Sequence, residues 1–63
     1  MDLMTLDEVA EMLRKSPNQI RWMRHMGTGP KAALIGGRVM FRKADVVAWV
    51  DAQFAAQGGA PEP

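Results

Sequence analysis

The chain has 63 residues, of which 48% are hydrophobic and 24% are charged, and it contains no cysteine. This length allows one small domain of globular composition, and it leaves little room for a substrate pocket of ~300 Å3 or more. Disulfides, thiolate metal sites and a membrane span of ~20 apolar residues are excluded. We therefore expect a non-enzymatic, cytoplasmic binding module that needs no cofactor and no metal.

The net charge of +1 hides a strong segregation of charge along the chain. All eight basic residues lie between positions 14 and 43, and the seven acidic residues lie before or after that segment. Helix dipoles explain part of this pattern, since acidic residues favour the first turn of a helix and basic residues the last. They do not explain Lys31 and Arg38, which lie in non-helical sequence. The layout therefore favours a polyanionic partner.

The first expected element is a helix that begins after Thr5. Thr5 and Glu8 have the spacing of a capping box, in which each side chain bonds to the backbone N–H of the other residue. Apolar residues recur at helical spacing from Leu6 onward, so one face of the helix is suited to a core. We expect this helix to end near Arg14.

A second helix start follows almost at once, at Ser16. Ser16 and Gln19 repeat the capping-box spacing, and Pro17 suits the first helical position. Gly27 is suited to the cap after the last turn. Two helices joined by two or three residues must cross steeply, which is the geometry of a helix-turn-helix. The side chains expected to face inward are Ile20, Met23, Met26 and the stem of Arg24.

The chain then changes from helical to strand periodicity. Residues 33–35 and 39–41 are apolar, and Gly36 and Gly37 lie between them. Two successive glycines favour a type I′ hairpin turn, because that turn needs positive φ at both of its central residues. A lone two-stranded hairpin is marginally stable in water, so we expect it to pack on the helices.

A third helix is expected from about residue 44 to residue 56. Residues 57–63 show no apolar periodicity, and we expect a disordered tail there. The domain would then span residues 1–56, with a mostly helical fold and a small β-hairpin. The side chains expected to be buried under the third helix are Val46, Trp49, Val50 and Phe54.

The outward face of the second helix carries the side chains suited to reading DNA. Asn, Gln and Arg can each form two hydrogen bonds to a base edge in the major groove, and the capped start of the helix is suited to phosphate. Simple capping is the alternative role for Asn18 and Gln19. A solvated surface position is the alternative for Arg21 and His25. The outward residues are Asn18, Gln19, Arg21, Trp22 and His25.

Trp22 allows two interpretations. A core position is favoured, and the alternative is an exposed indole that stacks on the DNA backbone, grips a second subunit or packs beneath the hairpin. Arg38 at the hairpin tip would place a cation against the DNA backbone or minor groove. Ser16 has no base partner at a useful spacing, so it is a cap and not a nucleophile. The residues expected at the DNA are Arg14, Lys15, Ser16, Asn18, Gln19, Arg21, Trp22, Arg24, His25, Lys31, Gly37, Arg38 and Arg42, with Lys43 adding to the positive field.

The order of these elements resembles the excisionase and AlpA-like family of small winged helix-turn-helix proteins, which is related to the DNA-binding domain of MerR regulators. The matching segments are residues 3–13, residues 24–30 and residues 35–50, which contain Gly36-Gly37-Arg38. The resemblance implies that residues 17–26 enter the major groove and that residues 36–38 form a wing at the adjacent backbone or minor groove. It also implies one of two roles in the bacterial nucleoid. One is a phage recombination directionality factor, which binds and bends attachment-site DNA so that an integrase excises a prophage. The other is a small transcriptional regulator.

Two departures from the family pattern concern the second helix. Arg14 and Lys15 stand where the family often has Gly and Val, so Lys15 must lay its stem over the core or contact a phosphate. Met23 stands where an aromatic residue is common, and Trp22 lies one position earlier.

A single module of this size buries roughly 600–1,000 Å2 of protein surface on DNA and is expected to bind weakly by itself. The expected partners are therefore double-stranded DNA, further copies of the chain along the DNA and a phage integrase, but no membrane. The absence of a long hydrophobic seam favours a monomer in solution. The alternative from another class is a protein-interaction module, whose partner groove would be formed by Trp22, Met23 and Met26.

Overall fold

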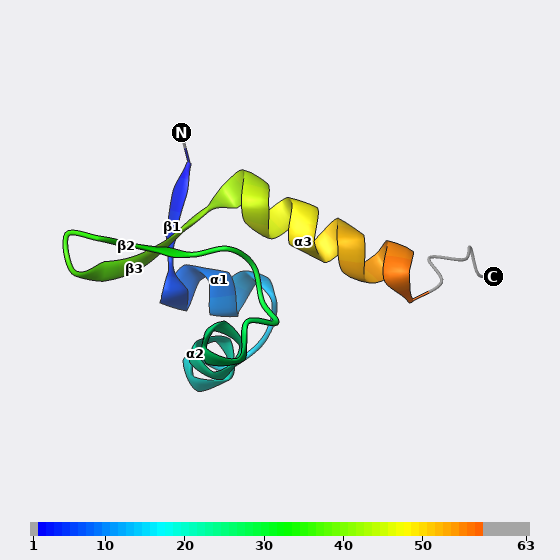
Figure 1. Cartoon of the computed structure of the whole chain (residues 1–63), viewed down its shortest axis with the longest axis horizontal. Helices are drawn as coiled ribbons and strands as arrows, with labels where there is room; N and C mark the ends of the chain where they lie inside the picture. Colours follow the sequence, from blue (N-terminus) through cyan, green and yellow to red (C-terminus); the bar gives the residue numbers. More distant parts are fainter. Residues whose placement is uncertain (1, 58–63) are drawn as a thin grey trace.

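The structure is a computed structural model that describes residues 2–57, so the expected tail at 57–63 lies outside the described residues except for its first residue. Three helices and a small antiparallel sheet make up this part of the chain, as the sequence predicts (Figure 1). The elements in chain order are β1 (Leu3–Thr5), α1 (Leu6–Met12), α2 (Pro17–Met26), β2 (Ala33–Ile35), β3 (Arg38–Arg42) and α3 (Lys43–Ala56).

Both predicted capping boxes are confirmed. The backbone N–H of Thr5 donates to Glu8 Oε1 at 2.8 Å, and that of Glu8 donates to Thr5 Oγ1 at 3.2 Å. At α2, the N–H of Ser16 donates to Gln19 Oε1 at 2.9 Å and that of Gln19 donates to Ser16 Oγ at 3.2 Å. Each box satisfies N–H groups that the first turn of a helix leaves free. The starts of α1 and α2 are therefore fixed locally.

The ends of α1 and α2 share one backbone motif. After α2, the N–H of Thr28 donates to the carbonyl of Met23, and Gly27 adopts a φ of 74°. After α1, the N–H of Lys15 donates to the carbonyl of Ala10, and Arg14 adopts a φ of 58°. This is the Schellman motif, in which glycine normally occupies the left-handed position. Helix α1 ends two residues earlier than predicted because the motif begins at Leu13, its C-cap.

The sheet has three strands, in the order β1-β3-β2, and not only the predicted hairpin. Gly36 and Gly37 have φ values of 59° and 83°, so the predicted turn with two positive φ angles is confirmed. Strand β1 adds a second partner to β3, with Met4 opposite Phe41. Strand β1 was not predicted, because three residues before a helix cap are too few to show a period.

The core contains one or two buried side chains from each helix and one from β3. Phe41 is 1% exposed and packs with Ile20, 1% exposed, at the point where the sheet meets the helices. Three inward predictions are wrong. Trp22 is 61% exposed, Met26 is 52% exposed and Phe54 is 70% exposed. The buried hydrophobic residues of this core are Val9, Ala10, Ile20, Phe41 and Val46, and Pro30 in the loop after α2 is buried as well.

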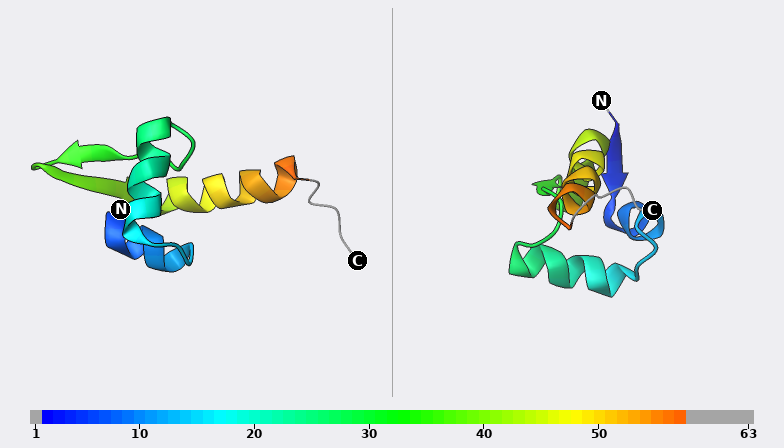
Figure 2. Two further views of the ribbon diagram at one scale, coloured as in Figure 1. Left: turned by 90° about the horizontal axis from the view of Figure 1, so that it is seen from below. Right: turned by 90° about the vertical axis from the view of Figure 1, so that its right-hand side faces the viewer.

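Helix α3 begins against the sheet and then projects from the rest of the molecule. Val46, near its start, is fully buried, whereas Trp49 and Val50 are only half-buried. Beyond them, α3 extends alone along the longest axis of the molecule (Figures 1 and 2). The dimensions of 44 × 25 × 19 Å reflect this projection.

Replacing Arg14 with glycine should stabilise the domain. A left-handed conformation costs a non-glycine residue ~1–2 kcal/mol, and glycine avoids this cost. Part of the gain, ~0.5–1 kcal/mol, is offset because glycine loses more backbone entropy on folding. We expect Arg14→Gly to raise the free energy of unfolding by about 0.5–1 kcal/mol in urea titrations followed by circular dichroism. Arg14→Ala is the control, since it removes the same charge and keeps the unfavourable φ. Equal stability of the two variants would contradict the prediction.

Candidate nucleic-acid interface

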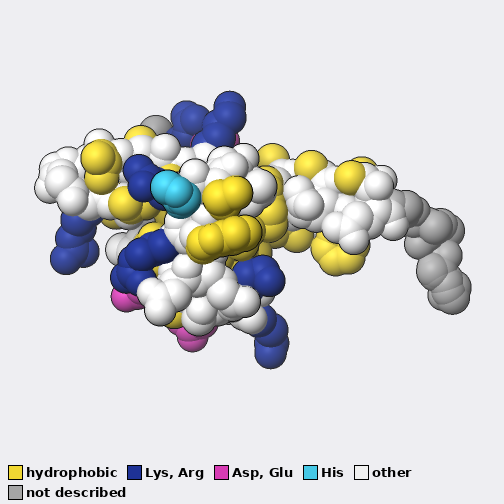
Figure 3. Space-filling model, turned by 60° about the horizontal axis from the view of Figure 1, so that its bottom comes forward, with side chains coloured by type: hydrophobic (Ala, Val, Ile, Leu, Met, Phe, Trp, Pro, Cys, Tyr) yellow, Lys and Arg dark blue, Asp and Glu magenta, His cyan; other side chains and the backbone are white. Residues whose placement is uncertain are grey.

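Helix α2 presents one face to the core and the opposite face to solvent. Ile20 is buried and Met23 is half-buried, which sets the inward direction. At 3.6 residues per turn, positions 18, 21, 22 and 25 then lie on the opposite side. Figure 3 shows the histidine and a group of hydrophobic side chains over this region, with lysine and arginine side chains around them. The exposed residues of this outer face are Asn18, Arg21, Trp22 and His25.

Four polar side chains at the start of α2 have defined partners. Ser16 and Gln19 form the capping box, so the capping interpretation is confirmed for both residues. The side-chain oxygen of Gln19 is occupied there, while its NH2 group has no described partner. Asn18 Oδ1 accepts a hydrogen bond of 2.7 Å from Arg21 Nη1. This bond fixes the direction of the Arg21 guanidinium relative to the helix.

The wing lies next to α2 on the Arg21 side. Arg21 and Arg38 line the same surface hollow of about 290 Å3, together with Thr5, Leu6, Asp7 and Val39, so one acidic residue also faces this hollow. No carboxylate lies within ion-pair distance of either guanidinium in the described part of the chain. Two cations from segments 17 residues apart in sequence thus meet at one surface. That arrangement suits a phosphate backbone.

Trp22 lies on the other side of the outer face. It lines a hollow of about 380 Å3 with Lys15, Asn18, Gln19 and Met23. The core interpretation of Trp22 is therefore wrong, and the indole stands in solvent between a lysine and two amides. Lys15 is exposed and lines this hollow beside Met23. An exposed aromatic ring flanked by a cation can stack on a sugar or base, or contact a thymine methyl group.

The remaining predicted basic residues lie at three places in the fold. Arg24 and Lys31 line a hollow of about 470 Å3 at the end of α2, beside Gly27. Arg42 lies at the base of the wing, where its Nε donates to Asp45 Oδ2 at 2.8 Å. This ion pair compensates the charge of Arg42, so its contribution to a positive field is smaller than predicted. Arg14 is exposed in the turn before α2.

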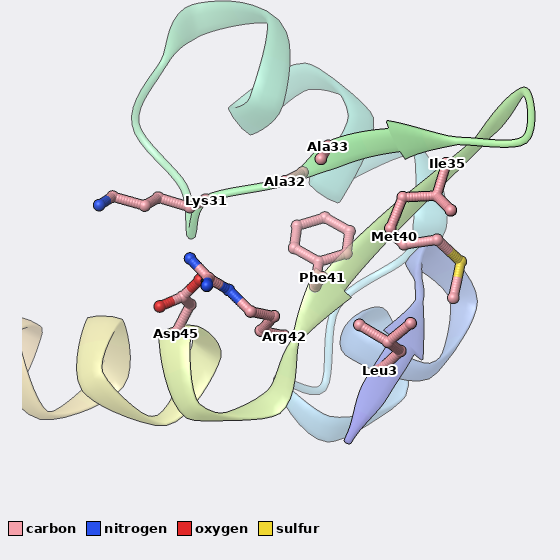
Figure 4. A pocket seen from close by; sticks show the side chains of 9 residues that line it. All are labelled: Leu3, Lys31, Ala32, Ala33, Ile35, Met40, Phe41, Arg42 and Asp45. Atoms are coloured by element: carbon pink, nitrogen blue, oxygen red, sulfur yellow. The ribbon is translucent and has the colours of Figure 1, made fainter. Parts of the chain in front are cut away.

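Figure 4 shows the hollow in which Arg42 lies, about 440 Å3 in volume, between the sheet and the start of α3. Arg42, Asp45 and Lys31 gather at one end, and Leu3 and Met40 lie at the other. The polar end is not part of the outer face of α2. The structure thus divides the predicted DNA contacts into one group at α2 and the wing tip and another at the base of the wing.

One contact that was not predicted from the sequence holds the loop between α2 and the wing. Trp49 Nε1 donates to the backbone carbonyl of Thr28 at 3.1 Å, and Thr28 Oγ1 donates to the carbonyl of Met23 at 3.4 Å. Gly29 lies against Met23, since a Cβ at Gly29 would be 3.3 Å from Met23 Cβ. Helix α3 is thereby tied to the loop that orients the wing. The indole N–H of Trp49 needs a partner, but the sequence does not reveal which one.

Two further classes of site are absent from residues 2–57. No group of three or more metal-ligating side chains occurs among them. None of their helices is long and apolar enough to cross a membrane.

Comparison with known proteins gives one family match. A family described as a helix-turn-helix domain matches residues 3–53, which include every described element except the last turn of α3. Comparison with curated proteins and with solved structures gives no match.

Removing the cap of α2 should destabilise the outer face. Ser16→Ala deletes the acceptor of the Gln19 N–H, and an N-cap of this kind is worth about 1 kcal/mol. We expect that loss in the free energy of unfolding measured by urea titration. Ser16→Asp is the matched control, because aspartate also caps and should retain most of the stability. If Ser16→Ala and Ser16→Asp lost equal stability, the cap would not be the cause.

Proposed function

The chain belongs to the helix-turn-helix domain family, which comprises excisionase- and AlpA-like small DNA-binding proteins, and we propose that it is an excisionase. In this role it binds and bends attachment-site DNA and directs a phage integrase toward excision. Helix α2 enters the major groove, and the wing formed by β2 and β3 contacts the adjacent backbone or minor groove. In this proposal, the integrase cuts and rejoins the DNA strands, and the present chain only binds and bends the DNA.

The observation that carries the proposal is the outer face of α2 together with the hollow that Arg21 of this helix shares with Arg38 of β3. Asn18 and Arg21 form a hydrogen-bonded pair on that face, and such a pair can present a guanidinium fork to a guanine. Arg38 shares a hollow with Arg21, so one side chain can read a base edge while the other holds the backbone. Trp22 supplies an apolar surface beside them.

The electrostatics of the described residues support the same mode of binding. Six of the eight basic residues lie in the turn before α2, in α2 and in β3, Lys31 lies in the loop before β2 and Lys43 is the first residue of α3, whereas the acidic residues among those described belong to α1, α3 and the N-terminal segment. With about six phosphate contacts, the logarithm of the binding constant should fall with the logarithm of salt concentration with a slope near −5. A protein that used the same surface for an acidic protein partner would show no preference between DNA sequences.

The small size of the module supports cooperative binding. A single helix and a wing bury roughly 600–1,000 Å2 of protein surface, which gives modest affinity by itself. Several adjacent copies, or a copy held by integrase, raise the effective concentration and with it the occupancy. An excisionase that assembles along repeated sites fits this requirement.

Arg38 and Arg21 should respond differently to substitution. We expect Arg38→Ala to weaken binding to all duplexes alike and to reduce the steepness of the salt dependence by about 1, because it removes one phosphate contact. We expect Arg21→Ala to cost about 1–3 kcal/mol on the specific site and less on scrambled DNA. Fluorescence anisotropy over a range of salt concentrations measures both. Arg38→Lys is the control, since it keeps the charge and should keep the slope. If Arg38→Ala left the slope of the salt dependence unchanged, the wing would not contact the DNA backbone.

A gel-shift titration tests the excisionase role. Phage or host attachment-site DNA is compared with scrambled DNA of equal length at matched salt. We expect discrete, stepwise, cooperative complexes on the attachment-site DNA alone. Specific complexes on promoter DNA but not on attachment-site DNA would point instead to a transcriptional regulator. No shift on any duplex at low salt would overturn the DNA-binding role.

A further inference from the structure

The second half of α3 has no cover within the described part of the molecule. Phe54 is 70% exposed and is the most exposed of the large hydrophobic side chains. Val47 is also exposed, and so are Ala52, Ala55 and Ala56. Figure 1 and the left view of Figure 2 both show this half of the helix standing clear of the other elements.

The composition of α3 is that of a helix in an interior. Its fourteen residues, KADVVAWVDAQFAA, include only three charged side chains and one glutamine. Helices that are apolar on all sides are normally buried in larger assemblies. Because α3 meets its own domain only through its first half, the other half needs a partner outside the domain.

The chain itself points to a second copy as that partner. Residues 58–63 read Gly-Gly-Ala-Pro-Glu-Pro and offer no large apolar side chain that could cover Phe54. Helix α3 carries two aspartates and one lysine, so it is unsuited to phosphate. The α3 helix of a second copy offers an apolar surface of the same length, and its three charged side chains cause little repulsion.

The geometry of the helix indicates how two copies would pack. Val47, Val50 and Phe54 have the spacing i, i+3 and i+7, which forms one ridge along the helix. At 3.6 residues per turn, the alanines at positions 52, 55 and 56 lie on other faces of the helix, so the ridge itself makes the contact between the two copies. In an antiparallel pair centred near Val50, Lys43 of one copy lies beside the C-terminal end of the other helix, where the free carbonyl groups are negative.

We propose that α3 is a self-association surface, through which two copies of the chain form an antiparallel, two-fold symmetric pair. A helix of 14 residues is ~21 Å long. Two such helices bury less than the ~800 Å2 per partner of a stable interface. The dimer is therefore weak and forms only at high concentration. At low concentration, the chain is the monomer expected from the sequence. The inference does not rest on DNA binding and is tested without DNA.

Sedimentation equilibrium of the full chain measures the association directly. We expect the mass to rise from the 7.0 kDa of one chain toward twice that value as the concentration increases from micromolar to about 1 mM. Phe54→Glu should weaken the dimer at least tenfold, because it places a charge in the seam. The matched control is Leu34→Glu, which alters a side chain of similar exposure, 66%, on β2. This variant should associate like the unmodified chain.

Single cysteines test the antiparallel arrangement, since the chain has none of its own. Val50→Cys, near the middle of the ridge, should form a disulfide-linked dimer on mild oxidation. Lys43→Cys, at one end of the ridge, should not, because the two copies of this position lie far apart in an antiparallel pair. Circular dichroism verifies that each variant is folded.

Three results would overturn the inference. The first is a mass of one chain at all concentrations up to about 1 mM. The second is equal weakening by Leu34→Glu and Phe54→Glu, which would indicate non-specific association. The third is faster cross-linking of Lys43→Cys than of Val50→Cys. In each case, binding of single copies to DNA would be unaffected, so the proposed function is tested separately.

Discussion

The fold depends on a core of five side chains to which four elements contribute. Val9 and Ala10 come from α1, Ile20 from α2, Phe41 from β3 and Val46 from α3. Strand β3 is central, because it pairs with both other strands and leads directly into α3. A domain of about 60 residues buries only ~60% of its unfolded surface. With so small a core, the local hydrogen bonds at the helix ends must define much of the geometry.

Much of the fold could be predicted because its boundaries are set by local chemistry. The capping box at Ser16 and the C-cap at Gly27 set the first and last residues of α2, and Gly36-Gly37 sets the turn of the wing. Strand β1 could not be predicted, since its pairing with β3 joins residues 35 to 39 positions apart. Phe54 was misplaced for a related reason. Periodicity assigns a side chain to one face of a helix, but it does not say whether anything covers that face.

The candidate site was predictable as a face, but the roles of its individual residues were not. The charge layout and the inward positions of α2 identify Asn18, Arg21 and His25 as outward residues. The sequence could not show that Arg42 pairs with Asp45, since the same spacing occurs in many solvated helices. It also could not place Trp22, because a tryptophan is apolar enough for a core and large enough for an interface. The tie between Trp49 and Thr28 spans 21 positions and needs the folded chain.

The two tryptophans have different surroundings, and this makes the chain its own optical probe. Trp22 stands in water on the outer face of α2, whereas Trp49 is half-buried and donates its N–H to the carbonyl of Thr28. Their emission maxima should therefore separate, with Trp22 toward the red and Trp49 toward the blue. A quencher dissolved in water reaches the first indole more readily than the second. Events at the outer face of α2 and events along α3 can thus be followed in one cuvette, without an attached dye.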